Sequence, residues 1–210
     1  MSPAEKLQRG IAQLGMALSA DAQNKLLSYL ALLQKWNKVY NLTAIGEQQM
    51  VSHHLLDSLA VIPHLWEGRW LDVGCGAGLP GLVMAVAQPD WQFTLLDSNS
   101  KKTGFVQQAV IELGLKNVSI HCARVEEWQS DELFDGIISR AFSELSDFLS
   151  GTHHLVAEQG RWAAMKGMPP QALTDVPSGY QVERVIRLQV PDLHAARSLI
   201  IAGRHPGVVR

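Results

Sequence analysis

The sequence predicts an α/β fold, in which a mostly parallel β-sheet has helices on both faces and follows a helical extension. From Trp70 onward, short apolar runs alternate with helical stretches, which is typical of βαβ units. Residues 1–66 show only the helical spacing of apolar side chains. The glycine-rich segment LDVGCGAGLPG, Leu71–Gly81, lies between the first apolar run and a second one. We therefore expect a helical extension over residues 1–66 and a sheet-containing core over residues 67–210.

The composition fits one globular domain with an appendage. The chain has 210 residues, 47% of them hydrophobic and 18% charged, and a net charge of −2. No run of about 18 apolar residues is present, and the N-terminal residues lack the apolar core of a secretory signal. The two cysteines, Cys75 and Cys122, give neither a disulfide framework nor a zinc-site spacing. We therefore expect a cytoplasmic monomer that neither enters a membrane nor binds a metal.

The extension is expected to contain at least two helices. Asp21 can cap a helix with apolar residues at helical spacing, and Asn37 and Asn41 interrupt that pattern. A further helix is expected from Gln48 to Val61, ending before Pro63 because proline disfavours helical geometry in the residue before it.

The core is expected to alternate five strands with three helices and to close with an antiparallel hairpin. The strands are predicted at Trp70–Val73, Phe93–Leu96, Val118–His121, Gly136–Ser139 and Trp162–Met165. The helices are predicted near Leu79–Ala87, Lys101–Leu113 and Ser143–Ala157. The hairpin strands are predicted at Val182–Val190 and Ser198–Ala202.

The glycine-rich loop is expected to let a ligand approach the backbone at Gly74, Gly76 and Gly78. Gly76, Gly78 and Gly81 match G-x-G-x-x-G, a weak sign of a dinucleotide whose pyrophosphate sits at a helix N-terminus. Asp72, however, stands two residues before the first glycine, where a carboxylate is unfavourable beside a diphosphate and favourable beside a cation. This pattern favours S-adenosylmethionine, which carries a sulfonium and an ammonium but no phosphate.

Two later segments support a nucleoside site. Asp97 ends the second predicted strand, where a carboxylate can accept both ribose hydroxyls, although it could also be a turn or helix-cap residue. ARVEEW follows the third strand, and we expect its Val125 and Glu126 to contact the adenine. The alternative is that these two residues begin a surface helix, where acidic side chains are favoured.

No general base is assigned, and this absence is informative. The fourth strand ends in ISRAF, which has neither the Asn/Asp-Pro-Pro-aromatic tetrad of amine methylation nor the cysteine nucleophile of pyrimidine C5 methylation. Guanine N7 needs neither device because it has an available lone pair. Arg140 is always charged and is expected to position an anion or guanine O6. Its alternative role is a surface ion pair with Glu144, four residues further on.

The C-terminal third is the basic part of the chain, with eight basic and six acidic residues after Gly136. Lys166 follows the fifth predicted strand, and both Lys166 and Arg197 are candidates for RNA phosphate contacts. The alternative for each is an exposed side chain with no partner role.

The segments WNKVYNLTAI, HHLLDSL, LDVGCGAGLPG, FDGIISRAF and AMKG resemble the bacterial 16S ribosomal RNA guanine-N7 methyltransferases, also called glucose-inhibited division protein B. The resemblance runs nearly end to end. It implies a class I methyltransferase (Rossmann-like) fold and transfer of a methyl group from S-adenosylmethionine to N7 of one guanine in the decoding region of 16S ribosomal RNA. The expected partner is 16S ribosomal RNA or the small ribosomal subunit.

The resemblance also implies roles for particular residues. The implied cofactor contacts are Gly74, Leu79, Val125, Glu126 and Arg140, and the implied RNA contacts are Lys166 and the C-terminal strand with Arg197 and Arg204. The chain departs from the family at Gly104, where a basic residue is common, and in its ending RSLIIAGRHPG, where Arg204 replaces a usual lysine.

Three other functions remain open from the sequence. A nicotinamide-dependent oxidoreductase would use the G-x-G-x-x-G match. A non-catalytic nucleotide-sensing module would use the helical extension to bind a protein. A methyltransferase for small molecules is disfavoured by the basic C-terminal third.

Overall fold

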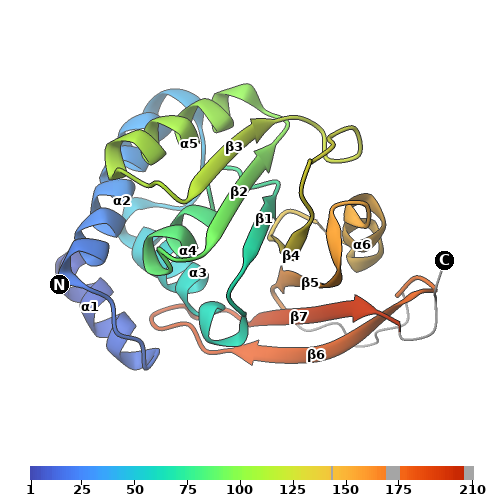
Figure 1. Cartoon of the computed structure of the whole chain (residues 1–210). Helices are drawn as coiled ribbons and strands as arrows, with labels where there is room; N and C mark the ends of the chain where they lie inside the picture. Colours follow the sequence, from blue (N-terminus) through green and yellow to red (C-terminus); the bar gives the residue numbers. More distant parts are fainter. Residues whose placement is uncertain (143, 169–175, 206–210) are drawn as a thin grey trace.

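A computed structural model describes residues 1–142, 144–168 and 176–205. Within them a seven-stranded sheet has the strand order β3-β2-β1-β4-β5-β7-β6, with helices on both of its faces (Figure 1). The strands are β1 (Arg69–Val73), β2 (Gln92–Asp97), β3 (Val118–Cys122), β4 (Phe134–Ser139), β5 (Val156–Lys166), β6 (Tyr180–Leu188) and β7 (Arg197–Arg204). The strands β1 to β5 pair in parallel, while β7 is antiparallel to both β5 and β6. The predicted mostly parallel α/β sheet and its closing hairpin are confirmed.

Side chains of alternate residues in the central strands enter two different hydrophobic cores. Trp70 of β1 packs into the larger core, with helices α1 to α5, and Leu71 packs into the smaller core, with α6. Figure 1 shows α6 on the opposite side of the sheet from α4 and α5. This alternation follows from strand geometry, since successive side chains point to opposite faces.

Three helices connect the parallel strands: α4 (Gly81–Ala87), α5 (Ser100–Leu113) and α6 (Leu145–Thr152). The helix predicted to run to Ala157 ends earlier, and its predicted first residue, Ser143, lies outside the described residues. Thr152 explains the early end. Its hydroxyl donates to the carbonyl of Phe148 at 2.6 Å and accepts from the indole N–H of Trp162 at 2.8 Å. The chain then enters β5, where Val156 pairs with Phe134.

The extension forms two regular helices and several short ones: α1 (Pro3–Gln13), α2 (Ala20–Tyr40), η1 (Glu47–Gln49), η2 (Val51–Leu56), α3 (Asp57–Leu59) and η3 (Ile62–His64). The prediction that Asp21 caps a helix is wrong. Ser19 caps α2 by accepting the N–H of Ala22 at 3.1 Å, and Asp21 pairs with Lys25 in the first turn. The helix ends at Asn41, which has the left-handed geometry common at helix C-termini.

The segment predicted as one helix, Gln48–Val61, is divided. Its middle part, η2, is a π-helix, and the α-helical geometry of α3 lasts for three residues. The α-helical geometry ends before Pro63, as predicted, and Pro63 lies in the separate short helix η3, where proline is tolerated in the first turn.

The extension packs on the sheet through a shared core. Leu26 and Leu33 of α2 belong to the same buried cluster as Phe105 of α5 and Leu82 of α4. The ring of Tyr29 lies 6.1 Å from the ring of Phe105. The hydrophobic core therefore continues across residue 67, where the domain boundary was predicted.

The carboxyl ends of the parallel strands meet at one edge of the sheet. Val73, Asp97, Ser139 and Lys166 end β1, β2, β4 and β5 there. Ser139 joins two of these ends, because its hydroxyl donates to the carbonyl of Val73 at 2.7 Å. In α/β folds this edge holds the ligand site.

None of the helices in the described part of the chain combines the length and the apolar character that a membrane span needs.

Candidate active site

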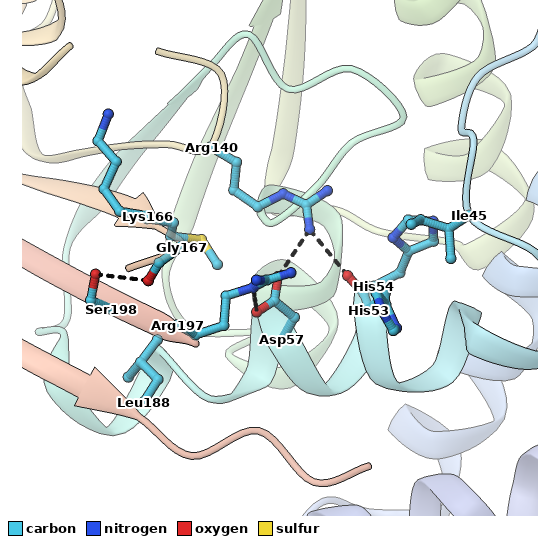
Figure 2. A pocket seen from close by; sticks show the side chains of 11 residues that line it. Ile45, His53, His54, Asp57, Arg140, Lys166, Gly167, Leu188, Arg197 and Ser198 are labelled. Carbon is cyan, nitrogen blue, oxygen red and sulfur yellow. Dashed lines mark hydrogen bonds and ion pairs between the residues drawn. The ribbon is translucent and has the colours of Figure 1, made fainter. Parts of the chain in front are cut away.

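Two cavities open at the carboxyl edge of the sheet. The first, which we call the Asp97 cavity, has a volume of about 330 Å³ and is lined by residues at the ends of β1, β2 and β3 and by Ala141 and Phe142. The second, the Arg140 cavity, has a volume of about 370 Å³ and lies between the extension, the end of β5 and the hairpin (Figure 2). Gly74, Asp97, Val125 and Glu126 line the first cavity, while Arg140, Lys166 and Arg197 line the second.

Packing of the chain itself explains two of the three predicted loop glycines. A Cβ atom on Gly74 would lie 2.6 Å from Cβ of Ala141, and one on Gly78 would lie 2.5 Å from Cδ1 of Leu82. At Gly76, where φ is +57°, a Cβ atom would meet only a backbone oxygen at 4.0 Å. The chain's own packing therefore requires glycine at positions 74 and 78, while Gly76 faces open space and Gly74 also lines the Asp97 cavity.

Two residues of the segment Leu71–Gly81, Asp72 and Leu79, are buried. Leu79 is 3% exposed, and its N–H donates to the carbonyl of Cys75 at 2.8 Å. Asp72 is fully buried, and its Oδ2 accepts the N–H of Gly81 at 2.7 Å. Burial raises the pKa of the Asp72 carboxyl from 3.8 to about 7. The expectation that Asp72 lies beside a cationic ligand is not met, because its carboxylate points to the start of α4 and does not line the cavity.

Asp97 has the geometry of a ribose acceptor. Its Oδ2 accepts the N–H of Gly76 at 2.9 Å, and its Oδ1 accepts the N–H of Asn99 at 2.9 Å. Asn99, and not Asp97, caps α5 through its side chain. Each carboxylate oxygen can accept two hydrogen bonds, so each Asp97 oxygen retains one acceptor position; the Lys102 ammonium lies 4.0 Å from Oδ2.

Val125 and Glu126 lie in a turn and not at the start of a surface helix, so the alternative interpretation of ARVEEW is wrong. The N–H of Trp128 donates back to the carbonyl of Arg124 at 3.0 Å, which closes the turn. Among the described residues, the N–H groups of Val125 and Glu126 have no acceptor. Their position on the cavity wall makes these donors available to a heterocycle.

Arg140 and Arg197 converge on one carboxylate in the Arg140 cavity (Figure 2). Arg140 Nη1 lies 3.3 Å from Asp57 Oδ2 and 3.3 Å from the carbonyl of His53, and Arg197 Nε lies 3.0 Å from Asp57 Oδ1. The predicted alternative for Arg140, an ion pair with Glu144, does not form within the described residues. Arg140 therefore faces the cleft, at the end of β4.

The other predicted RNA contacts are divided between two places. Lys166 lines the Arg140 cavity, but its side chain points away from Arg140 and Arg197 (Figure 2), and its Nζ donates to the carbonyl of Phe142, on the wall of the Asp97 cavity, at 2.6 Å; burial lowers its pKa. Arg204 lies at the far end of β7 from Arg197, donates to the carbonyl of His153 at 3.1 Å and stacks over Trp162. The structure thus brings together Arg140, Lys166 and Arg197, and it places Arg204 elsewhere.

Sequence reasoning missed three residues that build this region. Asp57, in the HHLLDSL segment, accepts hydrogen bonds from Arg140 and Arg197. Tyr29 donates its buried hydroxyl to the carbonyl of Ala77 at 2.7 Å and so attaches α2 to the glycine-rich loop. His54 lines the Arg140 cavity, and burial lowers its pKa to about 4. No local pattern marks these roles, because each partner lies in a distant segment.

Within residues 1–142, 144–168 and 176–205, no three side chains of His, Cys, Asp or Glu are grouped so that they could hold a metal ion.

The Asp97 cavity fits the nucleoside part of S-adenosylmethionine. It is lined by Gly74, by Asp97, whose Oδ2 also accepts the N–H of Gly76, and by Val125 and Glu126, whose N–H groups are unbonded within the described residues. Its two acidic side chains, Asp97 and Glu126, are matched by two basic ones, Lys102 and Arg124. This balance suits an uncharged nucleoside and provides no excess of positive charge for a diphosphate.

Comparison with solved structures agrees with the fold. TrmN from Thermus thermophilus superimposes with a TM-score of 0.57 at 16% identity, covering 74% of this chain and 53% of that one. An S-adenosylmethionine-dependent methyltransferase from Thiobacillus denitrificans, solved with S-adenosyl-L-homocysteine, has a TM-score of 0.53 at 12% identity, covering 83% and 98% of the two chains. At these identities the likeness establishes the class I methyltransferase fold.

Sequence comparison goes further. Ribosomal RNA small subunit methyltransferase G of Laribacter hongkongensis is 51% identical over 205 residues, covering 97% of this chain and 99% of that protein. The proteins of the same name from Neisseria meningitidis and Pseudomonas aeruginosa are 52% and 49% identical, covering 97% and 96% of this chain and 100% and 95% of theirs. The family model described as rRNA small subunit methyltransferase G matches residues 22–201, and the chain belongs to that family.

Proposed function

We propose that this protein transfers a methyl group from S-adenosylmethionine to N7 of one guanine in the decoding region of 16S ribosomal RNA. The observation that carries the proposal is the pair of cavities at the carboxyl edge of the sheet. One has the donors and acceptors that a nucleoside needs, and the other presents cationic side chains. The family membership supports a methyltransferase and not a nicotinamide-dependent oxidoreductase or a sensing module.

The Asp97 cavity binds the methyl donor. Asp97 accepts the ribose hydroxyls, and the turn at Val125 and Glu126 donates its N–H groups to the adenine. Gly76 allows the ligand to lie against the backbone. When bound, S-adenosylmethionine supplies an electrophilic methyl group on a sulfonium. Gly74 shapes the cavity through its contact with Ala141, and the buried Leu79 packs under the loop. Arg140, the remaining cofactor contact that the resemblance implies, lines the neighbouring cavity.

The chain needs only to orient the guanine, because N7 already has a free lone pair. Arg140 cannot accept a proton. His54 is neutral near pH 7, but its Nε2 lies 3.0 Å from the hydroxyl of Thr43, which also accepts the N–H of Ile45. Nε2 is thus engaged with Thr43, and the other ring nitrogen, Nδ1, is buried with no partner among the described residues, so neither nitrogen is presented to the substrate as a base. Orientation of well-aligned partners can contribute roughly 7–11 kcal/mol to lowering a barrier.

The Arg140 cavity faces the RNA. Arg140 and Lys166 position the target nucleotide, and Arg197 contacts RNA phosphate beside them. Arg204, at the opposite end of β7, is retained as a weaker candidate that would require the RNA to reach around the hairpin. The protein acts on 16S ribosomal RNA or the small subunit, as a cytoplasmic monomer.

Transfer of a labelled methyl group tests the proposal. Small ribosomal subunits, and RNA extracted from them, are taken from cells that lack this enzyme and incubated with methyl-labelled S-adenosylmethionine. Label is expected in the 16S RNA of at least one preparation, and none when the subunits come from cells that contain the enzyme. Absence of label from both unmodified preparations, with a folded protein that binds S-adenosylhomocysteine, would refute the proposal.

A further inference from the structure

The extension supplies the one carboxylate among the charged side chains that line the Arg140 cavity. Asp57 begins α3, Arg140 follows β4, and Arg197 begins β7, so three separate elements meet at this point. The Asp57 side chain is 3% exposed, while those of Arg140 and Arg197 are 29% and 25% exposed. A buried carboxylate thus binds two guanidinium groups that remain partly exposed to the cavity.

The hydrogen bonds to Asp57 leave each guanidinium with donors to spare. Arg140 uses Nη1 for Asp57 and His53, and Arg197 uses Nε for Asp57 and Nη1 for the carbonyl of Ala196. Within the described residues, Nη2 of neither arginine contacts an acceptor. A guanidinium fixed on one side by a carboxylate is pre-organised to bind an anion with its remaining N–H groups.

The charge of the cavity calls for an anionic ligand. Two guanidinium groups, those of Arg140 and Arg197, face one carboxylate, that of Asp57, while the Lys166 side chain points away from them and donates to the carbonyl of Phe142 (Figure 2). Positive charges that are partly withdrawn from water are costly unless an opposite charge compensates them.

We propose that Asp57 is a positioning residue that holds Arg140 and Arg197 as a two-arginine receptor for a backbone phosphate of the RNA substrate. The proposal rests on the proposed function, since it assigns a place to the RNA beside the bound methyl donor. The role of the extension is then to complete the substrate site as well as to cover the sheet.

The donor's own carboxylate is the other anion that could reach this cavity. The amino-acid tail of S-adenosylmethionine also carries an ammonium group, so it brings no net charge to balance the excess of cations. An RNA phosphate carries a full negative charge and two exposed oxygens that suit a paired arginine contact. The phosphate therefore fits the charge of the cavity better.

Asp57→Asn separates positioning from simple electrostatics. It removes a negative charge, so a role through charge alone predicts tighter RNA binding. Positioning predicts the opposite: KM for the RNA substrate rises about tenfold or more, as expected when hydrogen bonds to charged groups are lost. The dependence of log KM on log salt concentration also becomes shallower by about 0.7, the value for one phosphate contact on a single strand. The Kd for S-adenosylhomocysteine stays within about threefold, because the Asp97 cavity is intact.

Two further variants keep the test decisive. Asp192→Asn is the matched control, because Asp192 also pairs with an arginine, Arg9, but is 41% exposed and lies outside the Arg140 cavity; it should leave KM unchanged. Arg197→Lys preserves the charge and removes the planar fork, so it should raise KM even if Asp57→Asn does not fold.

Three results would overturn the phosphate receptor. The first is an unchanged or lower KM in a folded Asp57→Asn protein. The second is an unchanged KM in Arg197→Lys. The third is a weaker Kd for S-adenosylhomocysteine with an unchanged KM for RNA, which would assign the arginines to the donor carboxylate. Failure of the proposed function is distinguishable, since the parent protein would then methylate no RNA.

Discussion

Within the proposed donor site, Asp97 is the side chain that we expect to contribute most to binding of the methyl donor. It orders the loop through Gly76 and the cap through Asn99, and it keeps acceptors for the ribose. Replacement Asp97→Ala is expected to weaken S-adenosylhomocysteine binding by roughly 10- to 100-fold, the effect of losing hydrogen bonds to a charged group. Isothermal titration calorimetry measures this affinity. Asp90→Ala, at an exposed turn, is the control and should not change it. Equal affinities in the two variants would contradict the ribose role.

The buried carboxyl of Asp72 predicts a pH dependence of stability. Its pKa is about 7 in the folded protein against 3.8 as the ordinary value, so between these pH values the folded protein holds a proton that the unfolded chain has released. The parent therefore loses stability as pH rises through this window, by up to about 1.4 kcal/mol per pH unit. Asp72→Asn cannot ionise. The difference in unfolding free energy, variant minus parent, should rise with pH and level off above about 7.

Urea titrations at several pH values from about 4.5 to 8 measure this difference. The exposed Asp90→Asn should show no such trend. A difference for Asp72→Asn that does not change with pH would show that burial does not hold the carboxyl in its neutral form.

The sequence predicted some site residues because one rule places them. Asp97, Val125 and Arg140 each follow a parallel strand, and such strand ends share an edge of the sheet. Asp57 escaped the same reasoning, because its partner Arg197 lies 140 residues away and only the folded chain brings them together. Tyr29 could not be identified from the sequence either, since nothing local reveals that its hydroxyl reaches the carbonyl of Ala77.

At the scale of elements, α2 supports the glycine-rich loop from beneath. Tyr29→Phe removes the hydroxyl that donates to the buried carbonyl of Ala77. We expect a loss of about 1–3 kcal/mol in unfolding free energy, because the carbonyl is left without a donor. The affinity for S-adenosylhomocysteine should also fall, since the loop that carries Gly76 becomes less constrained.

Denaturant unfolding and calorimetry check both effects. Tyr40→Phe is a suitable control, because Tyr40 is 42% exposed at the end of the same helix. An unchanged stability in Tyr29→Phe would mean that this hydrogen bond contributes nothing to holding the loop.

Strand predictions succeeded where an apolar run was bounded by glycine or polar residues. They failed at the start of β5, where His153, His154 and Leu155 continue a helical pattern. There the tertiary contact of Thr152 with Trp162 and the pairing of Val156 with Phe134 override the local preference. The strand was predicted to begin only at Trp162, whereas β5 begins at Val156. Gly160 accounts for this difference, because glycine disfavours a strand and the pairing register of β5 with β4 shifts nearby.

At the level of the whole molecule, the fold places the Asp97 cavity and the Arg140 cavity at one edge of the sheet. The two cavities adjoin along the chain, because Ala141 and Phe142, which directly follow Arg140, line the Asp97 cavity. Parallel strand order alone predicts this edge. The contribution of the extension to the second cavity was not predictable, since it depends on how α3 packs against the hairpin.

Catalysis without a general base predicts how the rate depends on pH. At saturating RNA, kcat should change less than about twofold between pH values of about 6 and 9, because guanine N7 releases no proton before the transfer. KM for RNA should instead rise toward alkaline pH. Burial lowers the pKa of Lys166, so this side chain loses its positive charge earlier than an exposed lysine would. Steady-state kinetics with a saturating donor measure both constants. A tenfold rise in kcat per pH unit would indicate a base that the account lacks.

The position of the transferred methyl group on the RNA distinguishes guanine-N7 methylation from methylation of any other atom. The labelled 16S RNA is reduced with borohydride and treated with aniline, which cleaves the chain at N7-methylguanosine, and the break is located by primer extension. The account predicts one cleavage site, at a guanine of the decoding region, that depends on both the enzyme and the donor. Label without cleavage, which means a methyl group on another atom, would contradict it.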